Sequence, residues 1–187
     1  MKGLKADKNL RADALQNRHH ILNVAREALA SDPNTSLNAI AKMAKVGAGT
    51  LYRHFPSREA LIVGVYLKEI EHLVALSPEL LSKHKPLRAF QLWLEHLAQY
   101  GRVKHGFGNE LHAAMTDDIF KDTYWPMIDA LKSLLKACET SQDIHPGADP
   151  EDILLLLGFL WRIKPGRDAK ARADRLLKLI IAGLQAK

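Results

Sequence analysis

Residues 36–58, SLNAIAKMAKVGAGTLYRHFPSR, contain two short apolar-patterned segments separated by a turn. The first segment predicts a helix over residues 37–44, because its apolar residues recur at helical spacing and Ser36 can cap its first turn. The second segment predicts another short helix, in which Leu51 and Phe55 lie four residues apart and point inward. Two crossed short helices joined by a compact turn form a helix-turn-helix, whose second helix fits the major groove of DNA.

The positive charge of the chain is concentrated around this stretch. Residues 1–58 hold 10 Lys and Arg against 4 Asp and Glu, a net charge of +6, whereas residues 59–187 hold 17 of each. A basic region that coincides with a helix-turn-helix pattern is typical of a protein that binds a polyanion. Two other interpretations stay open: an ordinary helical hairpin, and a solvated basic face without a partner.

Two strings in this region resemble a known family. VGAGTLYRHFPSREAL closely resembles the recognition-helix segment of TetR-family transcriptional regulators, and NRHHILNVAREALA resembles their first helix. The resemblance is strong from about Arg11 to Leu73 and weak beyond. Leu29 stands where relatives usually place an aromatic residue, Lys45 where helix-turn-helix proteins prefer Gly, and Gly47 where many relatives carry a capping Ser. A left-handed conformation at Lys45 would cost about 1 kcal/mol relative to Gly.

The resemblance implies an all-α fold with two domains in a bacterial regulator. An N-terminal three-helix helix-turn-helix domain with a connecting fourth helix is expected over residues 1–76, of which residues 1–10 form a mobile basic arm. A C-terminal helical ligand-binding and dimerisation domain is expected over residues 77–187.

Local signals predict where the remaining helices begin and end. Ser77-Pro78 and Pro86 are expected to interrupt the chain, and Pro126 to kink or start a helix. Asp149 followed by Pro150 is a helix start, and Asp168 can cap the last helix. The helices themselves are expected over residues 11–30, 57–75, 87–103, 109–115 and 118–140, and in two segments after residues 149 and 168.

The resemblance and the exposed positions of the motif together predict the DNA contacts. Phosphate contacts are expected from polar and basic side chains near helix starts and on the second short helix, namely Arg18, Ser36, Lys42, Lys45, Tyr52, His54 and Arg58. Base reading is expected from the small and polar residues Ala48, Gly49, Thr50 and Arg53, with Gly47 beside them.

Two apolar segments near the C-terminus predict a homodimer. The resemblance implies a four-helix bundle with two helices from each subunit, which would place two recognition helices in successive major grooves of a palindromic operator. The side chains expected in this interface are Leu156, Leu160, Leu177, Ile180, Ile181 and Leu184. The alternative is that both segments belong to the core of one chain.

An aromatic-rich region between the two parts predicts a ligand site, because relatives bind a small molecule among the equivalent helices. An effector of mostly apolar or aromatic character is expected to contact Trp93, His96, Tyr100, His112, Met115, Tyr124 and Trp125. The alternative is that this aromatic stripe is only core.

Other function classes lack support in the sequence. The single cysteine, Cys138, excludes an intrachain disulfide, no metal-binding motif or cofactor is indicated, and no apolar run approaches about 20 residues. The sequence predicts a cytoplasmic DNA-binding regulator rather than an enzyme, and the resemblance to the TetR family implies that it is a ligand-responsive repressor of transcription. An architectural DNA-binding protein without an effector is the first alternative, and a helical enzyme acting on a phosphorylated substrate is the second.

Overall fold

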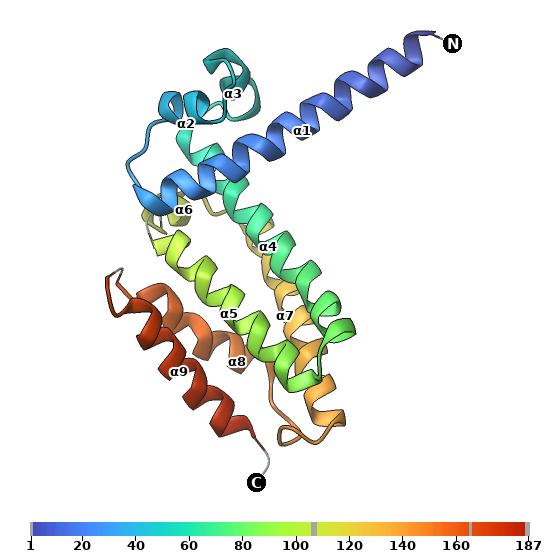
Figure 1. Ribbon diagram of the computed structural model, residues 1–187, viewed down its shortest axis with the longest axis vertical. Helices are drawn as coiled ribbons and strands as arrows, with labels where there is room; N and C mark the ends of the chain where they lie inside the picture. Colours follow the sequence, from blue (N-terminus) through green and yellow to red (C-terminus); the bar gives the residue numbers. More distant parts are fainter. Residues whose placement is uncertain (1, 106–107, 165, 186–187) are drawn as a thin grey trace. The chain divides into compact units, whose positions relative to one another are not determined.

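The computed structural model (Figure 1) describes the backbone of residues 2–105, 108–164 and 166–185, and side chains within residues 13–101, 108–164 and 166–185. These residues are almost entirely helical and contain no strand, which confirms the all-α prediction. In chain order the elements are α1 (Lys2–Ser31), α2 (Leu37–Met43), α3 (Ala48–His54), α4 (Arg58–Lys83), α5 (Pro86–His105), α6 (Gly108–Ala114), α7 (Asp117–Thr140), α8 (Pro150–Leu157), the 3-10 helix η1 (Gly158–Arg162) and α9 (Ala169–Leu184).

The chain divides into two compact units. One unit comprises Met1–Lys68 with Gly106–Ala114, and the other comprises Glu69–His105 with Met115–Lys187. The division falls inside α4, ahead of the boundary at residues 76 and 77 that the sequence suggests. The first unit therefore takes in α6, a helix distant in sequence from the rest of that unit.

The first unit is built on the helix-turn-helix. Ser36 caps α2 as predicted, because its Oγ accepts a hydrogen bond from the backbone N–H of Ala39 at 3.2 Å. Lys45 takes the left-handed conformation, with φ of 54°, and Gly47 is the N-cap of α3. Helix α1 begins at Lys2 rather than near Arg11, so the backbone expected to form an arm is helical.

The helices of this unit approach one another closely at Gly64 of α4. A Cβ atom at this position would lie 2.9 Å from Cε1 of Phe55 and 3.0 Å from Cδ2 of Leu22. Both side chains belong to the fully buried core of the unit, together with Ile21, Leu29, Ile40, Leu51, Leu61 and Ile62. The glycine thus lets α4 pack directly against α1 and the end of α3.

In the second unit α4 continues through Pro78 to Lys83, so the predicted break at Ser77-Pro78 is wrong. Tertiary bonds hold the helix here, because buried Ser77 donates to the carbonyl of Ala130 in α7 at 3.1 Å. The indole of Trp93 in α5 similarly donates to the carbonyl of Leu73 at 2.8 Å. Pro126 likewise lies inside the continuous helix α7.

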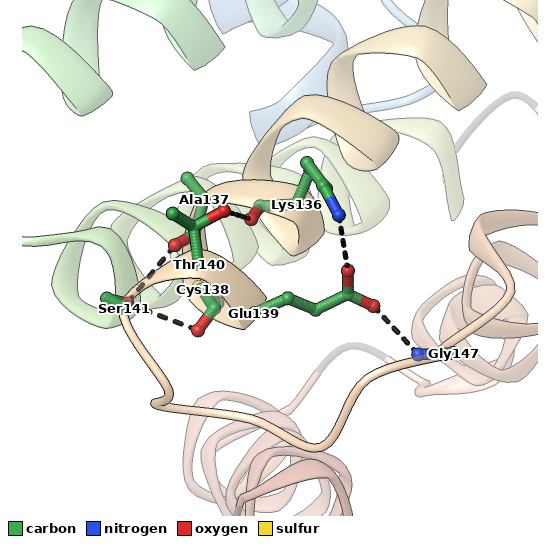
Figure 2. Close-up of polar contacts among 7 residues, drawn as sticks. All are labelled: Lys136, Ala137, Cys138, Glu139, Thr140, Ser141 and Gly147. Atoms are coloured by element: carbon green, nitrogen blue, oxygen red, sulfur yellow. Dashed lines mark hydrogen bonds and ion pairs between the residues drawn. The ribbon is translucent and has the colours of Figure 1, made fainter.

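The end of α7 is fastened to the loop that follows it (Figure 2). The carboxylate of Glu139 accepts hydrogen bonds from the backbone N–H of Gly147 at 2.8 Å and from Lys136 at 3.4 Å. These bonds, the one from Gly147 foremost, lower the pKa of Glu139. Ser141 closes the helix by donating to the carbonyl of Ala137 at 3.1 Å, so the chain enters α8 from a fixed turn.

Helix α8 starts as predicted, with Asp149 accepting from the backbone N–H of Glu151 at 2.7 Å and Pro150 in the first turn. It ends earlier than the apolar run suggests, because the chain tightens into η1 from Gly158. Gly101 stays within α5 and lets Trp161 of η1 pack against it, since a Cβ there would lie 3.0 Å from Cε3 of the indole.

Helix α9 packs against α5, beside which Figure 1 shows it running. Asp168 precedes α9, but its side chain makes no capping hydrogen bond, contrary to the prediction. The far end of α9 is tied to the α7–α8 loop by a bond from the backbone N–H of His145 to the carbonyl of Leu184 at 2.8 Å.

Candidate nucleic-acid interface

Helices α2 and α3 separate their buried and exposed side chains cleanly. Ile40, Leu51 and Phe55 are buried under the motif. The small, polar and basic residues predicted to meet DNA lie on the outer side, where Ser36, Lys42, Lys45, Gly47, Ala48, Gly49, Tyr52 and Arg53 are exposed and Thr50 and His54 are half-buried. The structure therefore brings these residues together on one basic, polar surface.

The side chain of Arg53 lies along the outer face of α3. Its Nε donates to the carbonyl of Gly49 at 3.2 Å, and an Nη donates to Oγ1 of Thr50 at 3.0 Å. These bonds link the first and last turns of α3 and fix the direction of the guanidinium group.

The predicted contact Arg18 is half-buried on α1, where its guanidinium carbon lies 5.1 Å from the centre of the Phe55 ring. This cation–π contact joins α1 to the end of α3. On the same helix His20 makes a hydrogen bond through Nε2 with the carbonyl of Ala44 at 3.0 Å, which satisfies the C-terminus of α2. Together these contacts orient the two short helices.

Arg58 has a different place from the predicted phosphate contact. Its guanidinium donates to the carbonyl of Thr35 at 2.7 Å and to the carbonyl of Pro33, and its Nε lies 3.8 Å from a carboxylate oxygen of Glu110 in α6. The side chain is only 26% exposed. Arg58 is therefore engaged inside the unit, where it joins the α1–α2 loop to the start of α4 and to α6.

Sequence reasoning missed the partners of Arg58, because Glu110 is 52 positions away and no local pattern connects the two. It also missed Met43, an apolar side chain at the end of α2 that is exposed beside the predicted DNA contacts. The apolar spacing of α2 places Met43 at the margin of the buried face, so sequence alone offered no signal for its exposure.

The predicted ligand residues have different surroundings in the structure. Trp93 and Tyr100 are core side chains of the second unit, and Tyr100 packs edge-on against Trp161 with ring centres 5.4 Å apart. The half-buried His96 ring meets His72, and Trp125 is 53% exposed on α7. The remaining three are exposed His112 on α6, half-buried Met115 between α6 and α7, and half-buried Tyr124 on α7.

Tyr124 does line a groove. Its hydroxyl donates to a carboxylate oxygen of Glu151 at 2.8 Å, and this bond is the main reason that the pKa of Tyr124 is raised. The groove has a volume of about 610 Å³ and is lined by Tyr124, Glu151, Leu154, Leu155, Leu156, Gly158, Phe159, Trp161 and Arg162. It combines an apolar lining with an acid, a phenol and a guanidinium.

The predicted dimer residues fall into two groups. Leu160 and Leu177 are buried in the core of their own chain, so they are not available to a second copy and that part of the prediction is wrong. Leu156 is 58% exposed, and Ile180, Ile181 and Leu184 are half-buried. Sequence reasoning missed Leu155 and Leu179, which are 79% and 68% exposed.

The described residues give no support to a reactive thiol, a metal site or a membrane-spanning helix. Burial raises the pKa of the Cys138 thiol to about 11, with a smaller contribution from Asp143, so the thiol stays protonated at neutral pH. Among the residues that the structure describes, no three His, Cys, Asp or Glu side chains are placed to hold a metal ion. Within that same part of the chain, no helix has the length and apolar character that crossing a membrane requires.

Two family models match this chain. Residues 21–65 match the bacterial regulatory proteins of the tetR family, and residues 85–186 match the C-terminal domain of SbtR-like transcriptional regulators. The HTH-type transcriptional regulator UidR of Escherichia coli (strain K12) is 39% identical over 69 residues, which are 36% of this chain and 35% of that protein. The chain thus spans about a third of the length of this curated relative.

Solved structures extend the similarity to nearly the full length. The TetR transcriptional regulator SCO0520 from Streptomyces coelicolor is 32% identical with a TM-score of 0.80, and the alignment covers 91% of this chain and 99% of that one. A TetR transcription regulatory protein from Mycobacterium vanbaalenii is 26% identical with a TM-score of 0.75, covering 95% and 99%. Together with the exposed basic helix-turn-helix, these matches show that the chain belongs to the TetR family of DNA-binding transcriptional regulators.

Proposed function

We propose that this chain is a ligand-responsive repressor, which binds a palindromic operator as a homodimer and leaves it when a small-molecule effector binds. The observation that carries the proposal is the outer face of α3. Its buried side, at Leu51 and Phe55, fixes the helix to the unit, while the side facing outward is small, polar and basic. A helix of this kind can enter a major groove and read base edges there.

The DNA contacts of the proposal follow the exposed residues. Phosphate contacts come from Ser36, Lys42, Lys45, Tyr52 and His54, and base contacts from Ala48, Gly49 and Arg53, with Thr50 beside them, whereas Arg58 is no longer among these contacts. Oγ of Ser36 accepts from Ala39, which leaves its hydroxyl hydrogen free to donate to a phosphate oxygen.

A homodimer is supported by the apolar surface on α8 and α9. Leu155, Leu156 and Leu179 are exposed there, an arrangement that is costly in water and is typical of an interaction site. A two-fold axis would bury this surface against its own copy, because an isologous interface uses the same patch on both subunits. Two recognition helices could then occupy successive major grooves, about 34 Å apart.

The groove beside Tyr124 supports an effector of mostly apolar character with a polar group. Its volume of about 610 Å³ lies within the range of about 300–1,000 Å³ that small-molecule sites occupy. Its margin shares Leu155 and Leu156 with the proposed dimer surface. An effector bound there would alter the pairing of two copies, and with it the separation of their recognition helices.

The test begins with selection of binding sites by the purified chain from random duplex DNA. A two-fold palindrome is the result expected of the proposed regulator. A flat sequence profile would instead indicate an architectural DNA-binding protein. If no sequence is enriched, the proposal that the chain binds an operator is wrong.

The dimer is tested by light scattering on Leu155→Glu combined with Leu179→Glu, because two carboxylates on the apolar surface oppose its burial. The wild type should have twice the mass of one 20.9 kDa chain, and the double variant should be monomeric and bind the palindrome far more weakly. The control is Ala75→Glu, at an exposed helical position on α4. A double variant that keeps the dimer mass would show that α8 and α9 do not form the interface.

A further inference from the structure

The outer face of α3 holds a guanidinium group whose direction is fixed by its own helix. Arg53 donates from Nε to the carbonyl of Gly49 at 3.2 Å and from one Nη to Oγ1 of Thr50 at 3.0 Å. All three residues belong to the surface that α3 presents outward. The arginine is thus held by two bonds within the helix rather than extended freely into solvent.

These two bonds determine which donors are left for a partner. Arginine has five N–H donors in one plane and no acceptor, and here two of them are directed at the helix itself. The donors that remain lie at the Nη1 and Nη2 end of the group. Thr50 accepts from the arginine, so its own hydroxyl hydrogen is also left to donate. The pair therefore offers mainly donors to whatever approaches α3.

A surface of donors discriminates between bases in the major groove. Guanine presents two neighbouring acceptors there, N7 and O6, and a guanidinium end can bond both at once. Adenine presents an acceptor beside an N6 donor, which a second donor would oppose, and cytosine presents an N4 donor. Thymine presents a single acceptor, O4, beside its methyl group, so it can accept only one of the two donors. Of the bases that can meet the end of Arg53, guanine is therefore the one whose hydrogen-bonding pattern matches.

We propose that Arg53 is the main base-reading side chain of α3, that it selects a guanine at one position in each half-site, and that Thr50 acts as a positioning residue for it. The half-site rests on the proposed function. The internal bonds limit the rotamer freedom that a long arginine side chain must lose on binding, which favours one geometry over many. A contact to a phosphate would gain from the charge of Arg53, but it would not require the two neighbouring N–H donors of the guanidinium group (its fork) to be held in one direction by Thr50.

The test is selection from random duplex DNA, followed by competition binding on the selected palindrome and on versions substituted at each base pair. Arg53→Ala should reduce the preference for guanine at one position per half-site by about 5- to 150-fold, the range for a lost bidentate pair, and leave the other positions unchanged. Arg53→Lys should lose most of the same preference while keeping the salt dependence of binding, because the charge stays and the fork is lost.

Thr50 is tested with variants that separate its hydroxyl from its shape. Thr50→Val should weaken the preference at the same guanine that Arg53→Ala affects, by less than Arg53→Ala does, and Thr50→Ser should keep it. Both residues are on the surface, so melting temperatures should stay near that of the wild type; Thr50→Ala serves if the valine variant is poorly folded.

Four results would overturn the proposal. If Arg53→Ala lowers affinity equally for all substituted sites, Arg53 contacts phosphate. If Thr50→Val changes a different base pair, Thr50 reads DNA by itself. If the wild type enriches no sequence at all, both this proposal and the proposed operator binding are wrong. If the wild type enriches a palindrome and Arg53→Ala does not change its base preferences, only this proposal is wrong.

Discussion

Replacement of Arg58 by alanine tests two roles for this residue. The structure indicates that Arg58 stabilises the fold, whereas its sequence position suggests a contact to a DNA phosphate. The guanidinium donates to the carbonyls of Thr35 and Pro33 and lies near Glu110, so it holds together the α1–α2 loop, the start of α4 and α6. A phosphate contact from the same side chain would instead act only when DNA is bound. Loss of the structural role would lower the stability of the protein and leave the salt slope of DNA binding unchanged. Loss of a phosphate contact would lower the salt slope and leave the stability unchanged.

The size of the effect on stability follows from the partners. A hydrogen bond from a charged donor contributes about 1.5–3 kcal/mol when it is sheltered, but Pro33 and Thr35 are half-buried and water can replace the lost donor. The ion pair with Glu110 spans 3.8 Å and is partly exposed, so it contributes less than about 1 kcal/mol. Arg58→Ala should then destabilise the fold by about 2–3 kcal/mol. For a chain of this length, that lowers the melting temperature by about 4–12 °C.

The assay combines thermal unfolding by circular dichroism with operator binding at several salt concentrations. Arg58→Ala should melt earlier, and the salt slope of its remaining DNA affinity should match that of the wild type. Arg58→Lys should recover part of the stability, while Glu110→Gln, the control for the weaker ion pair, should change the melting temperature by no more than about 4 °C. An unchanged melting temperature together with a salt slope reduced by about 1 would refute the assignment and restore the phosphate contact.

The sequence predicted those features of the fold that depend on a few neighbouring residues. Ser36 caps α2, and Asp149 with Pro150 starts α8. In each case the governing interaction joins atoms within about one helical turn, so the local sequence contains both partners. The position of the helix-turn-helix follows from the same kind of signal, and so does the outward face of α3.

Features that depend on distant partners were not predictable in this way. Pro78 lies inside α4, where the burial of Leu76 and Leu80 and the bond from Ser77 to Ala130 in another helix together oppose the local tendency of proline to end a helix. The engagement of Arg58 likewise depends on Glu110, which only the fold brings near.

For a related reason, some residues of the dimer prediction are exposed in the structure and others are buried. An apolar stripe on a helix records that side chains avoid water but not which surface covers them, so Leu177 and Leu179 look alike in sequence. In the structure Leu177 is buried within its own chain and Leu179 is exposed. Only the packing of α9 against α5 distinguishes a core position from one that a second copy can reach.

Two glycines in the DNA-binding unit should respond to alanine in opposite ways. Gly64→Ala should destabilise the protein by about 1–2 kcal/mol, seen as an earlier thermal transition, because the new Cβ would lie 2.9 Å from the Phe55 ring and 3.0 Å from Leu22 in a packed core; an unchanged transition would mean that α4 can move away. At Gly49 a Cβ meets nothing within 4 Å, so Gly49→Ala should be as stable as the wild type or more stable by up to about 1 kcal/mol. If the backbone of α3 approaches DNA closely at this point, the same methyl group must collide with DNA and weaken operator binding by about tenfold, a cost similar to overpacking a core. Because the protein alone has room for the methyl group, a loss of affinity without a loss of stability locates the collision on the DNA side. Equal or tighter binding by Gly49→Ala would show that α3 stands farther from the groove.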